Sequence, residues 1–310
     1  MKKIAKALTT ICLNLTLSSI GYSACYSIPD NLSENQINMI LRRDAQYESA
    51  VVRTLRNGGK LLFMGGVDFD SNGYAKNVSK RSFLYNPAAH SACELGQMSI
   101  PRQLAFMSVE LNDGRVLVAG GLTSNQRNTA KADLLNPDTG IWESVGSLAY
   151  SVRDVQLALM PSGNVLAVGG NASLKTGARW INFTQVFNIG SKTFGKINQL
   201  DRGRFFFALQ AHTDGRMLLV GGGFDIFDVG FASCANNNAV LAYNELLNKW
   251  TNLGDINPSP RYGYSDDSWI PKANAGMKPI HFISISDSQI LLKGGQSCTN
   301  DGNPDTLIDL

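Results

Sequence analysis

The sequence has little charge, few histidines and no long apolar run after its first residues. Charged residues make up 17% of the chain, and only three residues are histidines. The formal net charge is +3, but the basic residues Lys2, Lys3 and Lys6 supply three of the 28, which leaves 25 basic and 25 acidic residues in the rest of the chain. A neutral chain without a basic run has no electrostatic reason to bind nucleic acid or an anionic membrane. No stretch reaches the roughly 18 apolar residues of a transmembrane helix.

Signatures of catalysis and of metal binding are also missing. The sequence contains no CxxC pair, no HExxH motif, no phosphate-binding loop and no nucleophile elbow. The three histidines, His90, His212 and His281, stand far apart, and we expect ordinary surface or strand residues there rather than metal ligands. The sequence therefore predicts neither a metal nor a cofactor.

Residues 1–23 have the order of a secretory signal. A lysine-rich start is followed by a short apolar stretch and then by Gly21, Ser23 and Ala24. This predicts export to the periplasm or beyond. Cys25 leaves a lipoprotein open as an alternative, although Tyr22 stands where that signal expects a leucine.

Export permits disulfides, and four cysteines follow the leader. They allow three pairings of two bridges. These cysteines are Cys25, Cys93, Cys234 and Cys298.

The strongest signal is a fivefold internal repeat. Each copy has a turn, a mostly apolar run of four residues and a glycine pair, and the turns carry the Asn/Asp-Gly chemistry of hairpins in most copies. Continuous apolar runs of this length predict strands buried on both faces. The runs are 61–64, 116–119, 165–168, 217–220 and 290–293, the last of which is broken by Lys293.

A second half follows each glycine pair. An aromatic residue stands seven positions after an apolar anchor in three copies, as in Leu135 to Trp142, Phe187 to Phe194 and Tyr243 to Trp250. An arginine also precedes each following copy. These arginines are Arg102, Arg153, Arg204 and Arg261.

The glycine pairs with spaced aromatic residues resemble the kelch repeat over nearly all of residues 46–310. The resemblance implies an all-β fold, a β-propeller of about five four-stranded blades in residues 24–310. A single blade cannot bury both of its faces, so neighbouring blades must cover them. Most of the repeated residues are then scaffold.

The ends of the chain leave two arrangements open. The last copy stops at 306–310, where its third strand is expected, so the propeller is either truncated or completed by an N-terminal strand at 24–28. The second arrangement makes 33–45 a helical insertion with a capping box at Ser33 and Gln36. It also places Cys234 and Cys298 in equivalent loops of adjacent blades, which makes them the expected disulfide and leaves Cys25 to pair with Cys93.

A long insertion at 251–285 separates the last two copies and is the candidate ligand site. Its aromatic and charged side chains suit a sugar, because rings stack on apolar sugar faces and charged groups bind hydroxyls. The alternative without a ligand is a long loop in which Arg261 belongs to the scaffold. The candidate ligand-binding residues are Arg261, Tyr262, Tyr264, Asp266, Asp267 and Trp269.

Two functions remain open. The first is an exported propeller that binds a protein or a glycan without catalysis. The alternative is a carbohydrate-active enzyme resembling the periplasmic kelch epimerase that acts on sialic acid, since mutarotation needs only an acid, a base and an orienting arginine. Residues that could serve it are Arg202, Arg204, Arg261, Glu245 and Asp266.

Overall fold

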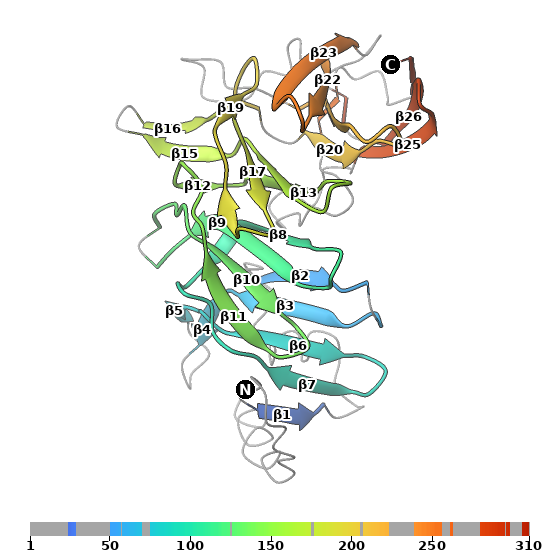
Figure 1. Ribbon diagram of the computed structural model, residues 1–310. Helices are drawn as coiled ribbons and strands as arrows, with labels where there is room; N and C mark the ends of the chain where they lie inside the picture. Colours follow the sequence, from blue (N-terminus) through green and yellow to red (C-terminus); the bar gives the residue numbers. More distant parts are fainter. Residues whose placement is uncertain are drawn as a thin grey trace. The chain divides into compact units, whose positions relative to one another are not determined.

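A computed structural model gives the architecture of most of the chain (Figure 1). It describes residues 24–28, 50–56, 58–69, 75–124, 126–174, 177–204, 207–222, 239–255, 261–262, 280–294, 296–297 and 306–309. Every regular element in these ranges is a β-strand. The chain forms two compact units, Met1–Ser147 and Leu148–Leu310. The expected helix at 33–45 lies outside the described residues.

The first unit contains two large antiparallel sheets. The first sheet has the order β1-β7-β6-β3-β2, and the second has the order β11-β10-β9-β8. The strands of the first sheet are β1 (Ala24–Ser27), β2 (Ala50–Thr54), β3 (Leu61–Gly65), β6 (Ser82–Asn86) and β7 (Ser91–Glu94). Those of the second are β8 (Gln103–Glu110), β9 (Val116–Leu122), β10 (Ala132–Asn136) and β11 (Ile141–Val145). A hairpin of β4 (Val67–Phe69) and β5 (Ala75–Val78) follows the first glycine pair.

The second unit contains the next three copies of the repeat. The third sheet pairs β13-β14-β17-β18 with β19 added to β17, the fourth has the order β20-β21-β22-β23, and the fifth has β25-β26-β28. The third sheet comprises β13 (Gln156–Leu159), β14 (Val165–Val168), β17 (Phe183–Asn188), β18 (Thr193–Phe194) and β19 (Asn198–Gln199). The fourth comprises β20 (Ala208–Ala211), β21 (Met217–Val220), β22 (Ala239–Asn244) and β23 (Lys249–Asp255). The fifth comprises β25 (Ile280–Ser286), β26 (Gln289–Gly294) and β28 (Thr306–Asp309).

Two small sheets complete the second unit. One has the order β12-β15-β16, and the other pairs β24 with β27. Their strands are β12 (Val152–Arg153), β15 (Asn171–Leu174), β16 (Gly177–Trp180), β24 (Arg261–Tyr262) and β27 (Gln296–Ser297). In each small sheet, a strand that lies before the first strand of its copy is hydrogen-bonded to a strand that follows the two glycines of that copy.

Of the two arrangements left open for the ends of the chain, completion of the last sheet by the N-terminal strand is wrong. β1 does not complete the last sheet; it pairs antiparallel with β7 as a fifth strand of the first sheet. Cys25 lies directly opposite Cys93, and the two form a disulfide with their Cα atoms 4.0 Å apart. The expected pairing of Cys25 with Cys93 is confirmed, although it was inferred with the N-terminal strand placed in the last sheet. Cys234 and Cys298 lie outside the described residues.

The apolar runs form the second strand of each sheet, as the repeat predicts. β9, β14 and β21 are buried along their whole length. β26 differs, because Ile290 and Leu292 are fully buried while Leu291 and Lys293 are only partly buried. Its buried side packs in a cluster with side chains of the fourth sheet, including Leu218 and Val240. Burial on both faces thus holds along the second, third and fourth runs and for residues 62–64 of the first, and it fails for the fifth.

Glycine is required at the end of the run because another backbone passes there. Gly65 has φ +66°, and a Cβ on it would overlap the carbonyl oxygen of Arg102. Gly66 donates a backbone hydrogen bond of 2.9 Å to that same carbonyl. The glycine pair therefore supplies both a positive φ and the space for a close approach.

The spaced tryptophans tie neighbouring sheets together inside each unit. Trp142 of the second sheet donates from Nε1 to Ser82 Oγ of the first over 2.8 Å. Trp250 of the fourth sheet donates to Thr184 Oγ1 of the third over 2.9 Å. Ser82 and Thr184 stand at the same place in their copies, three residues before Tyr85 and Phe187. A buried indole N–H needs such an acceptor.

Candidate functional site

Two of the repeated arginines are buried parts of the scaffold. Arg102 is fully buried and donates to Gly120 O (3.2 Å), to Lys131 O (2.8 Å) and to the Asp133 carboxylate (2.6 Å). Burial lowers the pKa of Arg102 from its ordinary value, and Asp133 opposes that shift. Arg204 is likewise fully buried, with hydrogen bonds to Gly221 O and Asp201.

Arg153 is different, because its strand is shifted by one residue. In the second sheet Gln103, the residue after Arg102, pairs with Leu122, two positions after Gly120. In the third copy Arg153 itself pairs with Asn171, two positions after Gly169. A shift of one residue turns a side chain to the opposite face. The side chain of Arg153 is accordingly 40% exposed, so Arg153 is not a buried scaffold arginine like Arg102 and Arg204.

The shift places Arg153 in a row of polar and aromatic side chains across the β12-β15-β16 sheet. Arg153 pairs with Asn171, and Asn171 pairs with Trp180. Directly paired residues share one face of a sheet. Asn171 is buried, and Arg153 and Trp180 are partly exposed. We call Arg153, Asp154, Asn171 and Trp180 the rim cluster.

Asp154 adds a strained and poorly solvated carboxyl group to the rim cluster. Its φ is +56°, a left-handed conformation that costs energy for a residue other than glycine. Its carboxylate lies 3.6 Å from Arg153 Nε, and its side chain is 29% exposed. Burial raises the pKa of Asp154 to about 6, although Arg153 opposes the shift. The group can therefore hold or release a proton near neutral pH and can still be reached from solvent.

The loop before the fourth sheet passes beside the rim cluster. A Cβ on Gly203 would overlap the carbonyl oxygen of Trp180, and the backbone N–H of Leu200 donates 2.7 Å to Asn182 O. This loop brings an exposed ion pair of Asp201 and Arg202 toward the same edge. The surface therefore combines an aromatic ring with cationic, anionic and amide groups.

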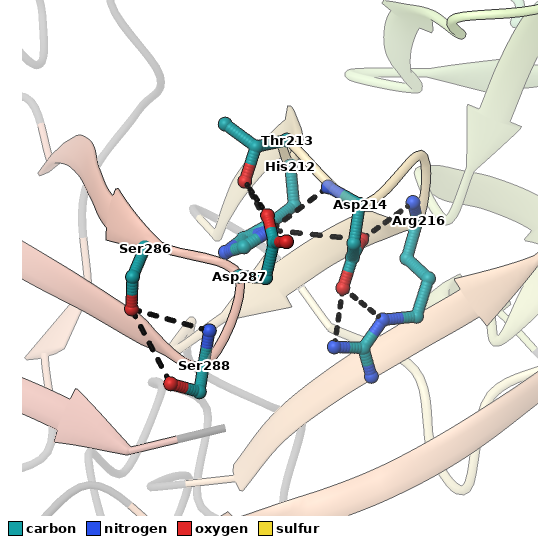
Figure 2. A network of polar contacts seen from close by, with 7 residues as sticks. All are labelled: His212, Thr213, Asp214, Arg216, Ser286, Asp287 and Ser288. Carbon is teal, nitrogen blue, oxygen red and sulfur yellow. Dashed lines mark hydrogen bonds and ion pairs between the residues drawn. The ribbon is translucent and has the colours of Figure 1, made fainter.

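A second polar network lies at the other end of the strands, at the turns into β21 and β26 (Figure 2). Thr213 donates to the carboxylate of Asp287 over 2.9 Å and so joins the fourth sheet to the fifth. His212 Nδ1 accepts from the Asp214 amide at 3.4 Å, and Arg216 donates to Asp214 Oδ2 over 2.6 Å. His212 is buried, and its Nε2 has no hydrogen-bond partner among the described residues.

His212 occupies a position that is apolar in the other copies. Its backbone N–H donates to Arg216 O across the turn, as those of Leu111 and Met160 do at their own turns. Leu111 and Met160 are both buried. The network therefore stabilises a turn and the contact between the fourth and fifth sheets. In the rim cluster, by contrast, the side chains of Arg153 and Asp154 are partly exposed to solvent. The rim cluster is the stronger candidate for a ligand.

The structure describes only part of the site expected from the insertion. Arg261 and Tyr262 form β24, and Arg261 pairs with Ser297, three positions after Gly294. In the second copy Arg102 takes the corresponding place before Gln103, so the backbone register of Arg261 is that of the scaffold arginine. Tyr264, Asp266, Asp267 and Trp269 lie outside the described residues.

Of the proposed acid, base and arginine candidates, Asp266 lies outside the described residues, and the described side chains are those of Arg202, Arg204 and Glu245. Arg204 is buried in the scaffold, Arg202 is exposed, and Glu245 accepts a hydrogen bond of 2.8 Å from Asn164. His90 lies exposed in the turn before β7. Among the described side chains no group of three or more His, Cys, Asp or Glu residues could hold a metal ion. The described residues also include no helix with the length and hydropathy of a membrane span.

The sequence patterns do not point to the rim cluster. Asp154, Asn171 and Trp180 belong to no repeated motif, and Arg153 was hidden among the scaffold arginines. One signal was present in Trp180, a tryptophan outside the seven-residue aromatic spacing.

Comparison with known proteins supports the fold alone. No model of a protein family matches the chain, and no curated protein sequence matches it. Among solved structures, the one titled "Structure of YjhT" matches with a TM-score of 0.53 at 14% identity, covering 85% of this chain and 80% of that one. This likeness agrees with an all-β, propeller-like fold of repeated antiparallel sheets.

Proposed function

We propose that the chain is an exported, kelch-type propeller that binds a glycan at the rim cluster. The observation that carries the proposal is the row of Arg153, Asn171 and Trp180 beside Asp154. An indole face stacks on the apolar face of a sugar ring, and the guanidinium, amide and carboxyl groups suit its hydroxyls. Binding residues of this kind are typically held on loops by a rigid scaffold.

The first test is calorimetric titration of residues 24–310 with a panel of neutral and acidic sugars, sialic acid included. We expect one class of sugar to bind, and Trp180→Ala and Arg153→Ala each to weaken binding at least tenfold, about 1.4 kcal/mol. Trp180→Phe keeps an aromatic face and should retain part of the affinity. Arg127→Ala, an exposed arginine of the other unit, is the control and should bind normally.

The proposal fails if a sugar binds with the same affinity to the wild type and to both rim variants. It also fails if no sugar in the panel binds to a protein that melts cooperatively. A protein ligand would then be the better interpretation.

A second candidate function is catalysis on the same sugar, and Asp154 is the observation that favours it. A carboxyl group whose pKa is raised to about 6 by burial suits general acid and base catalysis near neutral pH. Interconversion of sugar anomers, followed by NMR exchange spectroscopy, tests this candidate. A catalytic Asp154 requires that Asp154→Asn abolish the rate enhancement while sugar binding persists. A binding module gives no enhancement in the wild type.

The proposal includes export, with residues 1–23 as the signal peptide. The disulfide between Cys25 and Cys93 supports an oxidising compartment. Lipid attachment would need the same Cys25 sulfur, so the disulfide favours an unlipidated protein in the periplasm or outside the cell. Mass spectrometry of the mature N-terminus checks both points, because a chain beginning at Ala24 is incompatible with a lipidated Cys25.

A further inference from the structure

In the part of the chain that the structure describes, the N-terminal strand β1 is held to the first sheet by its disulfide, a four-residue ladder and one buried side chain. Four residues pair with β7, and the backbone N–H of Ile28 donates 2.6 Å to His90 O. Of the described side chains in residues 24–28, only Ile28 is buried, in a cluster with Phe63, Phe83, Tyr85 and Ala92. Ordering a terminal strand costs conformational entropy for every residue, and one buried side chain on a short ladder offsets little of it.

The other four strands of the sheet do not depend on β1. β7 pairs with β6 along all four of its residues, and β6 pairs with β3. Leu95 closes this strand pair with a backbone hydrogen bond of 3.0 Å to Ser82 O, and Arg81 forms an ion pair with Glu94. The sheet β7-β6-β3-β2 has the four strands of a complete copy of the repeat, and β1 is an addition at its edge.

The disulfide itself is within reach of reagents. Cys25 and Cys93 are both partly exposed, and the bond joins two strands at the outer edge of the sheet. A thiolate can attack a disulfide sulfur only where it has access. The bond is therefore open to thiol–disulfide exchange in the folded protein.

We propose that the Cys25–Cys93 disulfide is a redox lock on β1, and that its reduction releases this strand from β7 while the rest of the first sheet stays folded. A dithiol reductant supplies two electrons and two protons. It first forms a mixed disulfide with one cysteine, then closes to its own disulfide and leaves the Cys25 and Cys93 thiols free. Release uncovers the edge of β7, a row of backbone groups that an added strand could use.

Hydrogen exchange with mass spectrometry tests the lock on the full mature chain, residues 24–310, with and without dithiothreitol. Alkylation of the thiols confirms that the Cys25–Cys93 bond is intact before treatment and cleaved after it. Reduction should lower the protection of residues 24–28 at least tenfold and leave that of residues 82–86 unchanged. Cys25→Ser should behave like the reduced protein without any reductant.

Matched variants distinguish the contribution of the disulfide from that of the noncovalent contacts of β1. Ile28→Ala keeps the disulfide and should retain protection in the oxidised protein. Ser27→Ala, at an exposed position of β1, is the control and should behave as the wild type in both states. The proposal is overturned if residues 24–28 stay protected after confirmed reduction, because noncovalent contacts then suffice. It is also overturned if residues 82–86 lose protection with them, or if the bond is absent before treatment.

Discussion

At the scale of single residues, register rather than residue type decides what an arginine does. Arg102 and Arg153 stand at similar places in the sequence pattern, yet one is fully buried against Asp133 and the other is 40% exposed beside Asp154. A guanidinium buried with a carboxylate is a scaffold element, because removing either partner leaves an uncompensated buried charge and destabilises the fold. A partly exposed guanidinium beside an aromatic residue and an amide is free to meet a ligand's polar groups. The candidate site therefore arises from one residue of strand shift.

The raised pKa of Asp154 predicts a pH-dependent cost to stability. The folded value of about 6 lies above the ordinary 3.8, so the folded state keeps the proton up to a higher pH than the unfolded state does. The titration of Asp154 therefore costs no stability below about pH 4, lowers the free energy of unfolding as the pH rises from about 4 to 6, and keeps it lowered above that. The shift corresponds to about 3 kcal/mol at most, and we expect about 1–2 kcal/mol because the side chain is partly exposed.

Asp154→Asn should therefore raise the free energy of unfolding at pH 7.5 by about 1–2 kcal/mol, and the gain should vanish near pH 4. Asparagine fits the site because it tolerates positive φ at least as well as aspartate. Urea unfolding across this pH range measures the effect. Asp138→Asn, at an exposed turn, is the control and should show no such trend. If Asp154→Asn raises the free energy of unfolding equally at all pH values, the titration of Asp154 is not the cause of the increase.

At the scale of elements, the glycine pairs show how a backbone requirement becomes a sequence motif. Gly58 and Gly65 both have positive φ, at +83° and +66°. Nothing lies within 4 Å of a Cβ built on Gly58, whereas a Cβ on Gly65 would overlap Arg102 O. Both sites therefore require a positive φ, and they differ in whether the surroundings leave room for a Cβ atom.

Gly65→Ala should thus cost far more than Gly58→Ala. The positive φ alone costs an alanine about 1–2 kcal/mol, which is the whole penalty expected at Gly58. At Gly65 the loop of Arg102 must also move, and the total should reach at least about 3 kcal/mol. Chemical denaturation of the two variants gives both numbers. Equal costs would mean that the close approach of Arg102 is not what requires glycine.

The sequence predicted the elements that repeat and missed those that do not. The apolar runs and glycine pairs predict the second strands, because a local pattern sets them. The position of β1 was mispredicted, since an edge strand of four residues can pair with any open edge. The rim cluster was missed because strand register leaves no mark in composition. A one-residue shift changes which side chains share a face without changing the residues themselves.

At the scale of the whole molecule, the last sheet is buried on one side only. Ile290 and Leu292 are fully buried with the fourth sheet. On the other face, Ile283 pairs with Leu291, and Leu291 pairs with Leu307, which makes an apolar row across all three strands. Ile283 is 42% exposed and Leu307 is 55% exposed. An apolar row left in water contributes none of the burial by which neighbouring sheets of a repeat protein stabilise one another.

The proposed kelch-type fold includes closure of the five sheets into a ring. Such closure requires that this apolar row be covered in the folded protein. Leu307→Ser should then lower the free energy of unfolding by about 1–2 kcal/mol, because a covered leucine contributes through the apolar area it removes from water. Leu246→Ser is the matched control: this leucine is 97% exposed at a turn and should change stability by less than about 0.5 kcal/mol. Thermal and urea unfolding of both variants decide the question. If Leu307→Ser is as harmless as Leu246→Ser, the face of the last sheet is open to solvent and the sheets do not form a closed ring.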